Sequence, residues 1–236
     1  MNQFSIPATS MALFGIGSYT APEAARLLKT RPQKIRRWMA GYSYREGGEV
    51  RRMPPLWRTQ IPVMDDHLEI GFRDLVELRF VKAFVEAGVG LNVVRRCLDY
   101  ARELINDPRP LATQRFKTDG RTIFLESLDQ SDSIELLDLK RHQYVLPRVI
   151  DRTFRDLDIE DDVVVRWRPF KGKNTIVVDP ERSFGQPIAA RHGVPTAVLA
   201  DAVEAEGSVD LVSALYQVPA VTVRDSVRFE QYLRAA

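Results

Sequence analysis

Hydrophobic and polar positions predict two short helices near the N-terminal side of the chain. Thr20-Ala-Pro-Glu23 is a capping box, so a helix is expected to start at Ala21, and Thr30-Arg-Pro-Gln33 repeats the same device ten residues later. The first helix therefore has space for only about two turns before a tight corner. Two short helices that meet at a corner are typical of a helix-turn-helix.

A β-hairpin is predicted directly after the second helix. Residues 42–46 and 49–53 flank Gly47-Gly48, which supplies the positive φ angles of a two-residue turn. Pro54-Pro55 stops the second strand, and the chain then returns to the core. Placed after a helix-turn-helix, this hairpin is expected to be its wing.

The middle of the chain reads as a helical hairpin followed by short mixed elements. Apolar residues at helical spacing predict one helix over 72–87 that ends at Gly88, and a second that is capped by Asn92 and ends before Pro108. Residues 115–125 read as a β-hairpin around Asp119-Gly120. An acidic helical stretch follows, with a solvated helix face over 156–162, and then a short strand over 163–167.

Three short helices are predicted near the C-terminus. Thr196 can cap a helix that ends at Gly207, Ser208 can cap a second, and Thr222 can cap a third over 223–233. The predicted fold class is α+β and mostly α, with a winged helix-turn-helix, a helical hairpin with a β-hairpin, and a C-terminal three-helix, helix-turn-helix-like part.

These elements suggest four segments along the chain. We expect a DNA-binding winged helix-turn-helix over 1–66 and a helical hairpin plus β-hairpin, which could mediate dimerisation, over 67–126. An acidic connecting region over 127–174 and a helical domain over 175–236 complete the division.

Charge changes this picture because it is distributed unevenly. The net charge is only +2, yet ten basic residues stand against two acidic ones between Arg26 and Arg58. Between Asp129 and Asp162 ten acidic residues stand against five basic ones. The first density is that of a polyanion-binding segment, whereas the second should avoid nucleic acid.

The basic residues lie where a winged helix-turn-helix would meet double-stranded DNA. The second helix buries Ile35, Trp38 and Met39, which leaves its polar side chains on the outer face. We favour DNA binding over a merely solvated basic face, and we expect Trp38 and Trp57 to be core residues. The candidate DNA-binding residues on helix and wing are Arg31, Gln33, Lys34, Arg36, Arg37, Arg45, Arg51 and Arg52.

The order of these motifs resembles MerR-type winged helix-turn-helix proteins. The resemblance rests on Thr20-x-Pro-Glu-Ala-Ala-Arg-Leu-Leu, on Gly71-Phe-Arg-Asp-Leu-Val-Glu-Leu-Arg-Phe and on Ala87-Gly-Val. It implies that the helix over 72–87 pairs two protomers, so that a homodimer reads an inverted repeat. The chain lacks a long coiled coil and clustered cysteines, which argues against metal or redox sensing.

A second resemblance covers the C-terminal part. Arg166-Trp-Arg-Pro169, Ile176-Val-Val-Asp-Pro-Glu-Arg-Ser-Phe-Gly-Gln-Pro-Ile and Gly193-Val-Pro-Thr196 resemble VapB-type antitoxins of the larger, two-domain kind. The resemblance implies an antitoxin of a type II toxin-antitoxin pair. Its partners would be a PIN-like ribonuclease toxin, which it neutralises by contact, and its own operator DNA, at which it represses its operon. It could act as a homodimer or within a toxin-antitoxin hetero-oligomer.

Protein contact is the expected role of the C-terminal helices, because six acidic residues outnumber three arginines from Thr196 onward. Trp167 and Phe184 fit the interior of the fold better than a surface, and we favour that reading for both. Candidate toxin-binding residues, chosen as aromatic and arginine anchors, are Arg166, Trp167, Arg168, Phe184, Gln186 and Arg191.

No pattern in the sequence indicates catalysis, a metal or a cofactor. His67, His142 and His192 lie far apart and match no zinc or nucleophile-base spacing, and Cys97 falls in an apolar helical position typical of the core. No apolar run approaches the roughly 20 residues of a membrane span, so we expect a cytoplasmic protein. The alternatives to an antitoxin are a stand-alone MerR-like transcription regulator and an interaction scaffold without DNA binding.

Overall fold

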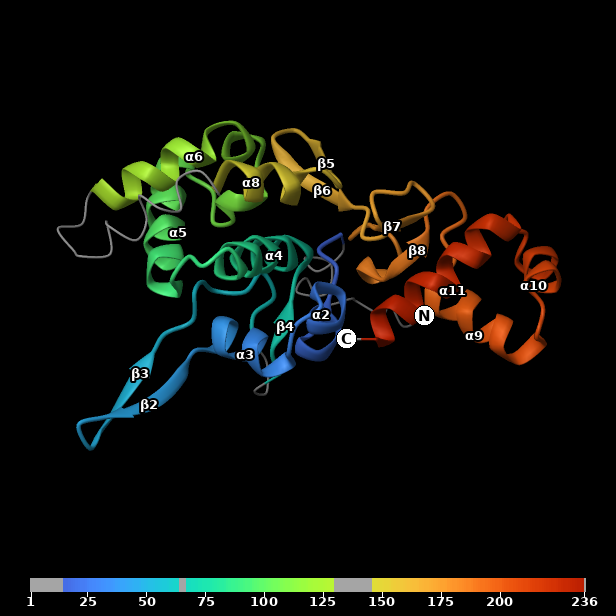
Figure 1. Cartoon of the computed structure of the whole chain (residues 1–236), viewed down its shortest axis with the longest axis horizontal. Helices are drawn as coiled ribbons and strands as arrows, with labels where there is room; N and C mark the ends of the chain where they lie inside the picture. Colours follow the sequence, from blue (N-terminus) through green and yellow to red (C-terminus); the bar gives the residue numbers. More distant parts are fainter. Residues whose placement is uncertain (1–14, 64–66, 130–145, 236) are drawn as a thin grey trace, which may run out of the picture. The chain divides into compact units, whose positions relative to one another are not determined.

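The computed structural model describes residues 15–63, 67–129 and 146–235, which divide into two compact units (Figure 1). One unit contains residues up to 33, 59–72 and from 166 onward, and the other contains 34–58 and 73–165. His142 and the acidic residues over 130–145 lie outside the described residues. The described part is mostly helical with short antiparallel sheets, so the predicted α+β, mostly α class is confirmed.

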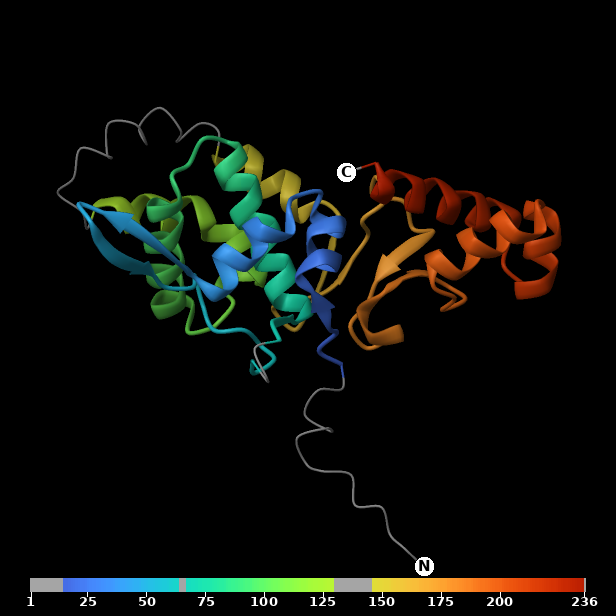
Figure 2. The same ribbon diagram turned by 90° about the horizontal axis from the view of Figure 1, so that it is seen from below.

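The first unit joins the N-terminal helix α2 to the C-terminal helices. Thr20 caps α2, with both halves of the predicted capping box present: its hydroxyl accepts from the Glu23 amide, and the Glu23 carboxylate accepts from the Thr20 amide at 2.7 Å. Figure 2 shows α9 lying along α11. The elements of this unit are β1 (Tyr19–Thr20), α2 (Ala21–Leu28), β4 (Glu69–Ile70), β7 (Ile176–Val178), η2 (Ser183–Gly185), β8 (Pro187–Ala189), α9 (Thr196–Glu206), α10 (Val209–Tyr216) and α11 (Ala220–Arg234).

Short antiparallel pairings hold the strands of the first unit. Tyr19 of β1 pairs with Ile70 of β4, and Val177 of β7 pairs with Ile188 of β8. The three C-terminal helices close over an apolar cluster of Ala189, Leu199, Val212, Val218 and Val223. The C-terminal part is therefore a helical cap beside β7 and β8, and Val178 of β7 also pairs with Trp167. β7 and β8 were not predicted from the sequence.

The second unit is a helical body with two hairpins. The two helices of the predicted hairpin are present as α4 and α5, and Gly88, at a φ of +90°, follows the first as expected, but α5 packs mainly along α6 and not along α4. The elements of this unit are α3 (Pro32–Ala40), β2 (Tyr42–Glu46), β3 (Glu49–Met53), α4 (Phe72–Glu86), α5 (Leu91–Ile105), η1 (Pro110–Ala112), α6 (Gln114–Asp129), α8 (Leu146–Phe154), β5 (Leu157–Glu160) and β6 (Val163–Trp167), the last of which runs on into the first unit.

The predicted β-hairpin over 115–125 is wrong, because these residues belong to α6. Gly120 does not make a turn but faces Phe116 and Ile150, and a Cβ there would lie 3.1–3.2 Å from their side chains. Asp119-Gly120 therefore marks a close helix contact. The apolar residues Phe116, Ile123 and Phe124 recur at helical spacing and are fully buried, which overrides the turn propensity of the dipeptide.

The predicted helix face over 156–162 is also wrong. α8 ends at Phe154, and the acidic residues that follow form β5 and the turn to β6, where Asp161 and Asp162 take φ angles of +47° and +67°. Asp156 lies 2.6 Å from the Arg79 guanidinium of α4. Short polar side chains tolerate left-handed backbone angles, which suits Asp161 and Asp162 to the tight turn between β5 and β6.

Several predicted caps are misplaced although their helices exist. α9 and α11 begin directly after Pro195 and Pro219, so Thr196 and Thr222 lie inside the helices. Likewise, α3 begins at Pro32 and α5 at Leu91, so Thr30 and Asn92 are not their caps. Gly207 and Ser208 take the predicted roles: the Gly207 amide bonds back to Val203 at a φ of +67°, and the Ser208 hydroxyl accepts from Leu211.

Phenylalanines fill the core of the second unit. Phe80 of α4 contacts Phe116 and Phe154 at ring-centroid distances of 6.0 and 4.7 Å, and Phe84 contacts Phe124 at 5.7 Å. These rings come from α4, α6 and α8 and tie the helices together. Cys97 is 1% exposed, as predicted for a core residue, and burial raises the pKa of its thiol to about 12.

Glu77 is a buried carboxyl group in this core. Its side chain is 1% exposed, its Oε1 accepts from the Ala112 amide at 3.0 Å, and its Oε2 has no hydrogen-bond partner among the described residues. Burial raises the pKa of Glu77 to about 8. The folded protein therefore keeps this carboxyl protonated at neutral pH.

This raised pKa makes stability depend on pH. The unfolded carboxyl, with a pKa near 4.5, is ionised above about pH 6, whereas the folded one releases its proton only near pH 8. The contribution of protonated Glu77 to stability is therefore complete below the unfolded pKa of 4.5. It is lost as the pH rises through the folded pKa of about 8. Relative to Glu77→Gln, the wild-type free energy of unfolding should fall by about 2 kcal/mol between about pH 6 and about pH 8. Urea unfolding of both proteins at several pH values tests this, and a parallel pH dependence would contradict it.

Candidate functional site

Helix α3 carries the first group of predicted DNA-binding residues. It buries Ile35, Trp38 and Met39, as predicted, so the remaining faces of this nine-residue helix are available to solvent. Arg36 and Arg37 are exposed and Lys34 is half-buried. The predicted residues Arg31 and Gln33, before and in the first turn of the helix, are also exposed.

The hairpin β2–β3 carries the second group, and it has the predicted turn. Gly47 and Gly48 take φ angles of +60° and +89°, and Glu46 pairs with Glu49 across the two-residue turn. Figure 1 shows the hairpin extending away from the helices of its own unit. Both strands are exposed along most of their length, which is uncommon for a structural hairpin.

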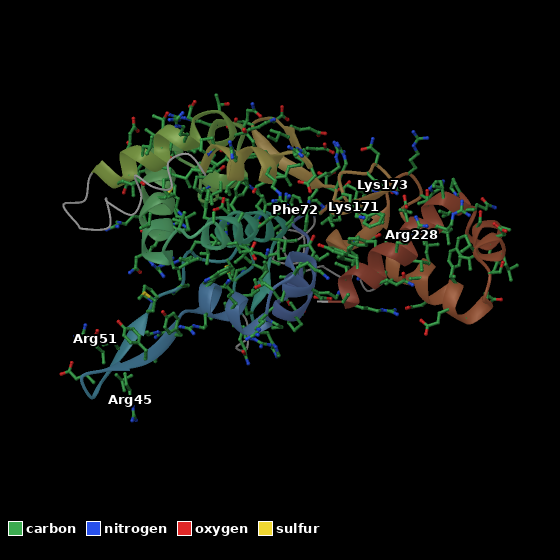
Figure 3. All side chains as sticks on the ribbon, in the orientation of Figure 1. Arg45, Arg51, Phe72, Lys171, Lys173 and Arg228 are labelled. Carbon is green, nitrogen blue, oxygen red and sulfur yellow. The ribbon has the colours of Figure 1, made fainter. Side chains whose placement is uncertain are left out.

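The three predicted arginines of the hairpin lie on two different faces. Residues that pair directly across an antiparallel ladder share a face, and the ladder pairs Tyr44 with Arg51, Arg45 with Val50, and Ser43 with Arg52. Figure 3 shows Arg45 and Arg51 pointing to opposite sides. We call the side with Ser43, Arg45, Val50 and Arg52 the arginine face and the side with Tyr42, Tyr44, Glu46, Glu49, Arg51 and Met53 the tyrosine face.

Charge distinguishes the two faces. The arginine face has two cations and no acidic residue. The tyrosine face has two carboxylates, and its one arginine, Arg51, lies 2.8 Å from Glu46 in an exposed ion pair. Only the arginine face therefore presents a net positive charge that a phosphate backbone would attract.

Stacking contacts orient the cations of α3. The guanidinium of Arg37 lies 3.9 Å from the ring centroid of Tyr42, and the ammonium of Lys34 lies 5.0 Å from the ring centroid of Trp38. Cation–π contacts restrict a long side chain without neutralising its charge. Arg37 thereby links α3 to the base of the hairpin while remaining a cation.

Gly41 allows the first strand of the hairpin to begin close to the last residue of the second strand. Its φ is +74°, and a Cβ at this position would collide with the carbonyl oxygen of Met53. The amide of Leu56 then bonds to the carbonyl of Trp38 at 2.8 Å. The two ends of the hairpin are thus fixed against α3.

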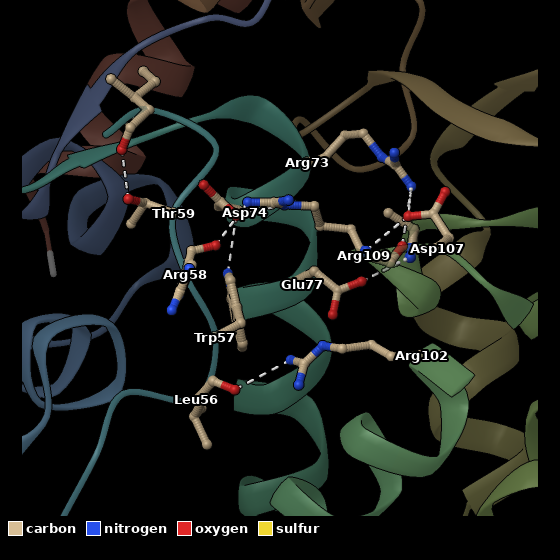
Figure 4. A network of polar contacts seen from close by, with 12 residues as sticks. Leu56, Trp57, Arg58, Thr59, Arg73, Asp74, Glu77, Arg102, Asp107 and Arg109 are labelled. Carbon is tan, nitrogen blue, oxygen red and sulfur yellow. Dashed lines mark hydrogen bonds and ion pairs between the residues drawn. The ribbon is translucent and has the colours of Figure 1, made fainter. Parts of the chain in front are cut away.

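Three arginines hold the segment that leaves the hairpin. Arg95 donates to the carbonyls of Pro54 and Pro55 at 2.9 and 2.7 Å. Arg102 donates to the carbonyl of Leu56 at 3.1 Å, and Arg109 to that of Arg58 at 2.8 Å (Figure 4). Charge-assisted bonds to successive carbonyls give a non-repetitive segment the order of a secondary-structure element.

Asp74 anchors the same segment from α4. Its Oδ1, in a residue with 0% exposure, accepts from the indole Nε1 of Trp57 at 2.9 Å and from the Nε of Arg109 at 2.9 Å (Figure 4). Trp57 is 6% exposed and Trp38 is 4% exposed, so both are core residues, as predicted. The hairpin therefore stands on a rigid base.

Sequence reasoning missed this base. Arg95, Arg102 and Arg109 recur every seven residues, and the first two therefore share one face of α5. That spacing indicates a common target on one side of the helix. The target consists of backbone carbonyls, which carry no sequence signature, so it could not be named in advance.

The predicted toxin-binding residues are divided between core and surface. Trp167 is 5% exposed, as expected for the interior, and Arg166 and Arg168 are half-buried. Gln186 and Arg191 are exposed. Phe184 is 75% exposed, so the preference for an interior position is wrong for this residue.

The described residues show neither a metal-binding cluster nor a membrane-spanning helix. They contain no group of three or more side chains that could hold a metal ion. None of their helices combines the length and apolarity that crossing a membrane requires. His67 and His192 are both exposed.

A known protein is similar in sequence to this one over most of the chain. No family model matches. A protein of Mycobacterium tuberculosis (strain ATCC 25618 / H37Rv) named "Putative antitoxin VapB45" is 26% identical over 226 residues, which cover 91% of this chain and 94% of that protein. The predicted resemblance to a VapB-type antitoxin is confirmed. Because the VapB-type similarity spans nearly the whole chain, it includes both the basic N-terminal segment and the C-terminal helices.

The fold is also found in a solved structure. The X-ray crystal structure of Rv2018 from Mycobacterium tuberculosis has a TM-score of 0.67 and 21% sequence identity, and the match covers 91% of this chain and 99% of that one. This similarity concerns the fold alone. It agrees with the mostly helical α+β class.

Proposed function

We propose that this protein is the antitoxin of a type II toxin-antitoxin system, that it neutralises a PIN-like ribonuclease by binding it, and that it represses its own operon by binding DNA. Neither role requires catalysis. The similarity to a protein named as a VapB antitoxin supports the first role. The exposed cations of α3 and of the arginine face support the second.

The observation that carries the DNA-binding role is the charged face of a hairpin that the fold does not need for its core. Arg45 and Arg52 are exposed, and no acidic residue shares their face. α2, α3 and this hairpin follow one another in the order of a winged helix-turn-helix, with α3 as the recognition helix and the hairpin as the wing. A dimer would present two such elements to an inverted repeat.

The candidate residues form two sets, one for DNA and one for the toxin. Operator DNA would be bound within 1–66 by Arg31, Gln33, Lys34, Arg36, Arg37, Arg45 and Arg52, whereas the remaining candidate, Arg51, lies on the tyrosine face and pairs with Glu46. The toxin would be bound by the C-terminal part, with Arg166, Arg168, Phe184, Gln186 and Arg191 as candidate contacts. We assign Trp167 to packing, because its side chain is buried.

Co-expression tests the antitoxin role. The neighbouring open reading frame is expressed from an inducible promoter with and without this chain, and growth and co-purification are measured. We expect growth arrest with the neighbour alone, recovery with both, and a complex that survives purification. If no complex forms and growth does not recover, while the chain still binds its promoter, the function is that of a stand-alone MerR-like regulator.

Two adjacent arginines test which face of the hairpin meets DNA. Arg52→Ala removes a cation from the arginine face, and we expect about 5- to 10-fold weaker operator binding and a salt slope reduced by about one. Arg51→Ala removes the same charge from the tyrosine face and should change affinity by less than about 2-fold. Fluorescence anisotropy at several salt concentrations measures both. A larger effect of Arg51→Ala would reverse the assignment.

A further inference from the structure

The turn at Ser183–Gly185 has an unusual backbone. All three residues take left-handed angles, with φ values of +48°, +55° and +80°. Only the last is a glycine, and a bulky residue such as Phe184 is disfavoured in this region by contact between its Cβ and its own backbone. A strained conformation persists only where the surrounding structure enforces it.

The strand that precedes α2 enforces this turn. The amide of Ser18 donates to the carbonyl of Phe184 at 3.1 Å, and the hydroxyl of Tyr19 donates to the carbonyl of Gly185 at 2.7 Å. Tyr19 is 3% exposed, and burial raises the pKa of its hydroxyl, which therefore keeps the proton that it donates. A Cβ on Gly185 would collide with this hydroxyl, so glycine is required there.

The fold gains little from the side chain that this strained turn presents. Phe184 is 75% exposed, the largest exposed fraction among the large hydrophobic residues of the described chain. An aromatic ring in water forgoes the burial that usually stabilises it. The strain of the turn and the exposure of the ring are thus two separate unfavourable contributions, and packing among the described residues explains neither.

A loop with exposed polar residues is tied to the turn that carries Phe184. Arg182 donates to the carbonyl of Ala190 at 2.6 Å, which ties the turn to the loop that carries the exposed residues Arg191 and His192. Gln186, also exposed, follows the turn directly. An aromatic anchor with arginine beside it is the composition of a protein-binding hot spot.

We propose that Phe184 is the anchor of a protein-binding surface: its ring enters an apolar pocket of the partner, and Arg191 meets acidic or carbonyl groups at the rim of that pocket. This inference rests on the proposed function, under which the partner is the ribonuclease toxin. A protein is favoured over a nucleic acid because the C-terminal helices beside this surface carry more acidic than basic residues.

Three substitutions at one position separate the ring from the strain. Phe184→Ala removes the ring and keeps a Cβ in the left-handed region, whereas Phe184→Gly removes both. Phe184→Tyr keeps an aromatic ring. We expect the alanine and glycine variants to bind the co-expressed product of the neighbouring open reading frame at least about 30-fold more weakly than wild type, and the tyrosine variant to bind within a few-fold of it.

The melting temperature distinguishes a binding residue from a structural one, because replacing a structural residue by glycine would lower it. Phe184→Gly should raise the melting temperature by about 2–4 °C, since the left-handed strain is relieved while no buried side chain is lost. Phe184→Ala should leave it nearly unchanged. A marked fall in melting temperature for Phe184→Gly would show that the ring serves the fold and would overturn the proposal.

Leu215→Ala is the matched control, because Leu215 is another large apolar residue, 61% exposed, on α10 of the same unit. It should leave partner binding unchanged. Loss of binding in Leu215→Ala with full binding in Phe184→Ala would place the partner on α10 and overturn the inference alone, as would Phe184-dependent binding of single-stranded RNA in place of the protein. Absence of any complex with the wild-type chain would instead overturn the proposed function and, with it, this partner for Phe184.

Discussion

Replacing Arg36 and Arg37 together by alanine is expected to weaken operator binding by at least about 30-fold, because each cation on a recognition helix contributes roughly 1–3 kcal/mol through phosphates or guanine edges. Both side chains are exposed, and neither is used by the core of α3. The salt slope should also fall by about two if both contact phosphates. Toxin neutralisation should remain intact, because it is assigned to the C-terminal part.

The matched control removes the same charge elsewhere. Arg224 and Arg228 are also two exposed arginines of one helix, α11. Arg224→Ala with Arg228→Ala should change operator affinity by less than about 3-fold, which reflects only the general loss of positive charge. Equal losses in the two double variants would mean that net charge, and not α3, governs binding. Equal loss of DNA binding and toxin neutralisation in Arg36→Ala with Arg37→Ala would refute the division of labour.

Replacing Asp74 by alanine is expected to lower the free energy of unfolding by about 3–5 kcal/mol, the usual cost of removing one partner from a buried ion pair. The carboxylate is completely buried and accepts from both Trp57 and Arg109. Without it, the indole NH and the Arg109 Nε lose this acceptor inside the protein. Chemical denaturation monitored by tryptophan fluorescence measures the change.

An exposed ion pair provides the comparison for Asp74. Asp201 lies 3.1 Å from Arg234, and both side chains are more than half exposed. Asp201→Ala should therefore cost less than about 1 kcal/mol. If the two variants were equally stable, Asp74 would not hold the base of the hairpin as described. Hydrogen exchange of the amides of 56–58 should moreover be faster in Asp74→Ala than in Asp201→Ala.

Local signals in the sequence were sufficient for much of the fold. The capping box at Thr20, the left-handed glycine after α9 and the Gly47-Gly48 turn each depend on a few neighbouring residues, and the structure has all three. The buried stripe of α3 also follows from helical spacing alone. These signals have their partners within one turn of the chain, but the same local reasoning misplaced the caps of α3, α5, α9 and α11, which begin at or directly after a proline or glycine.

Signals that depend on distant partners failed. Asp119-Gly120 has the composition of a turn, but its glycine serves contact with Ile150, thirty residues away in the numbering of the chain. The two faces of the hairpin are set by register, so composition could not show that Arg51 points away from Arg45 and Arg52. The local sequence around Phe184 does not show that it is exposed, because its turn is held by distant residues: the Ser18 amide bonds to the Phe184 carbonyl and the Tyr19 hydroxyl to the Gly185 carbonyl.

The dependence of operator affinity on salt tests the central claim most directly. The wild-type protein is titrated with its own promoter DNA and with a scrambled duplex at several salt concentrations. With about six of the candidate cations on phosphates, the slope of log K against log salt concentration should be about −5 or steeper, and the promoter should bind more tightly than the scrambled duplex. A flat response to salt, or equal affinity for the two duplexes, would contradict an operator-binding antitoxin.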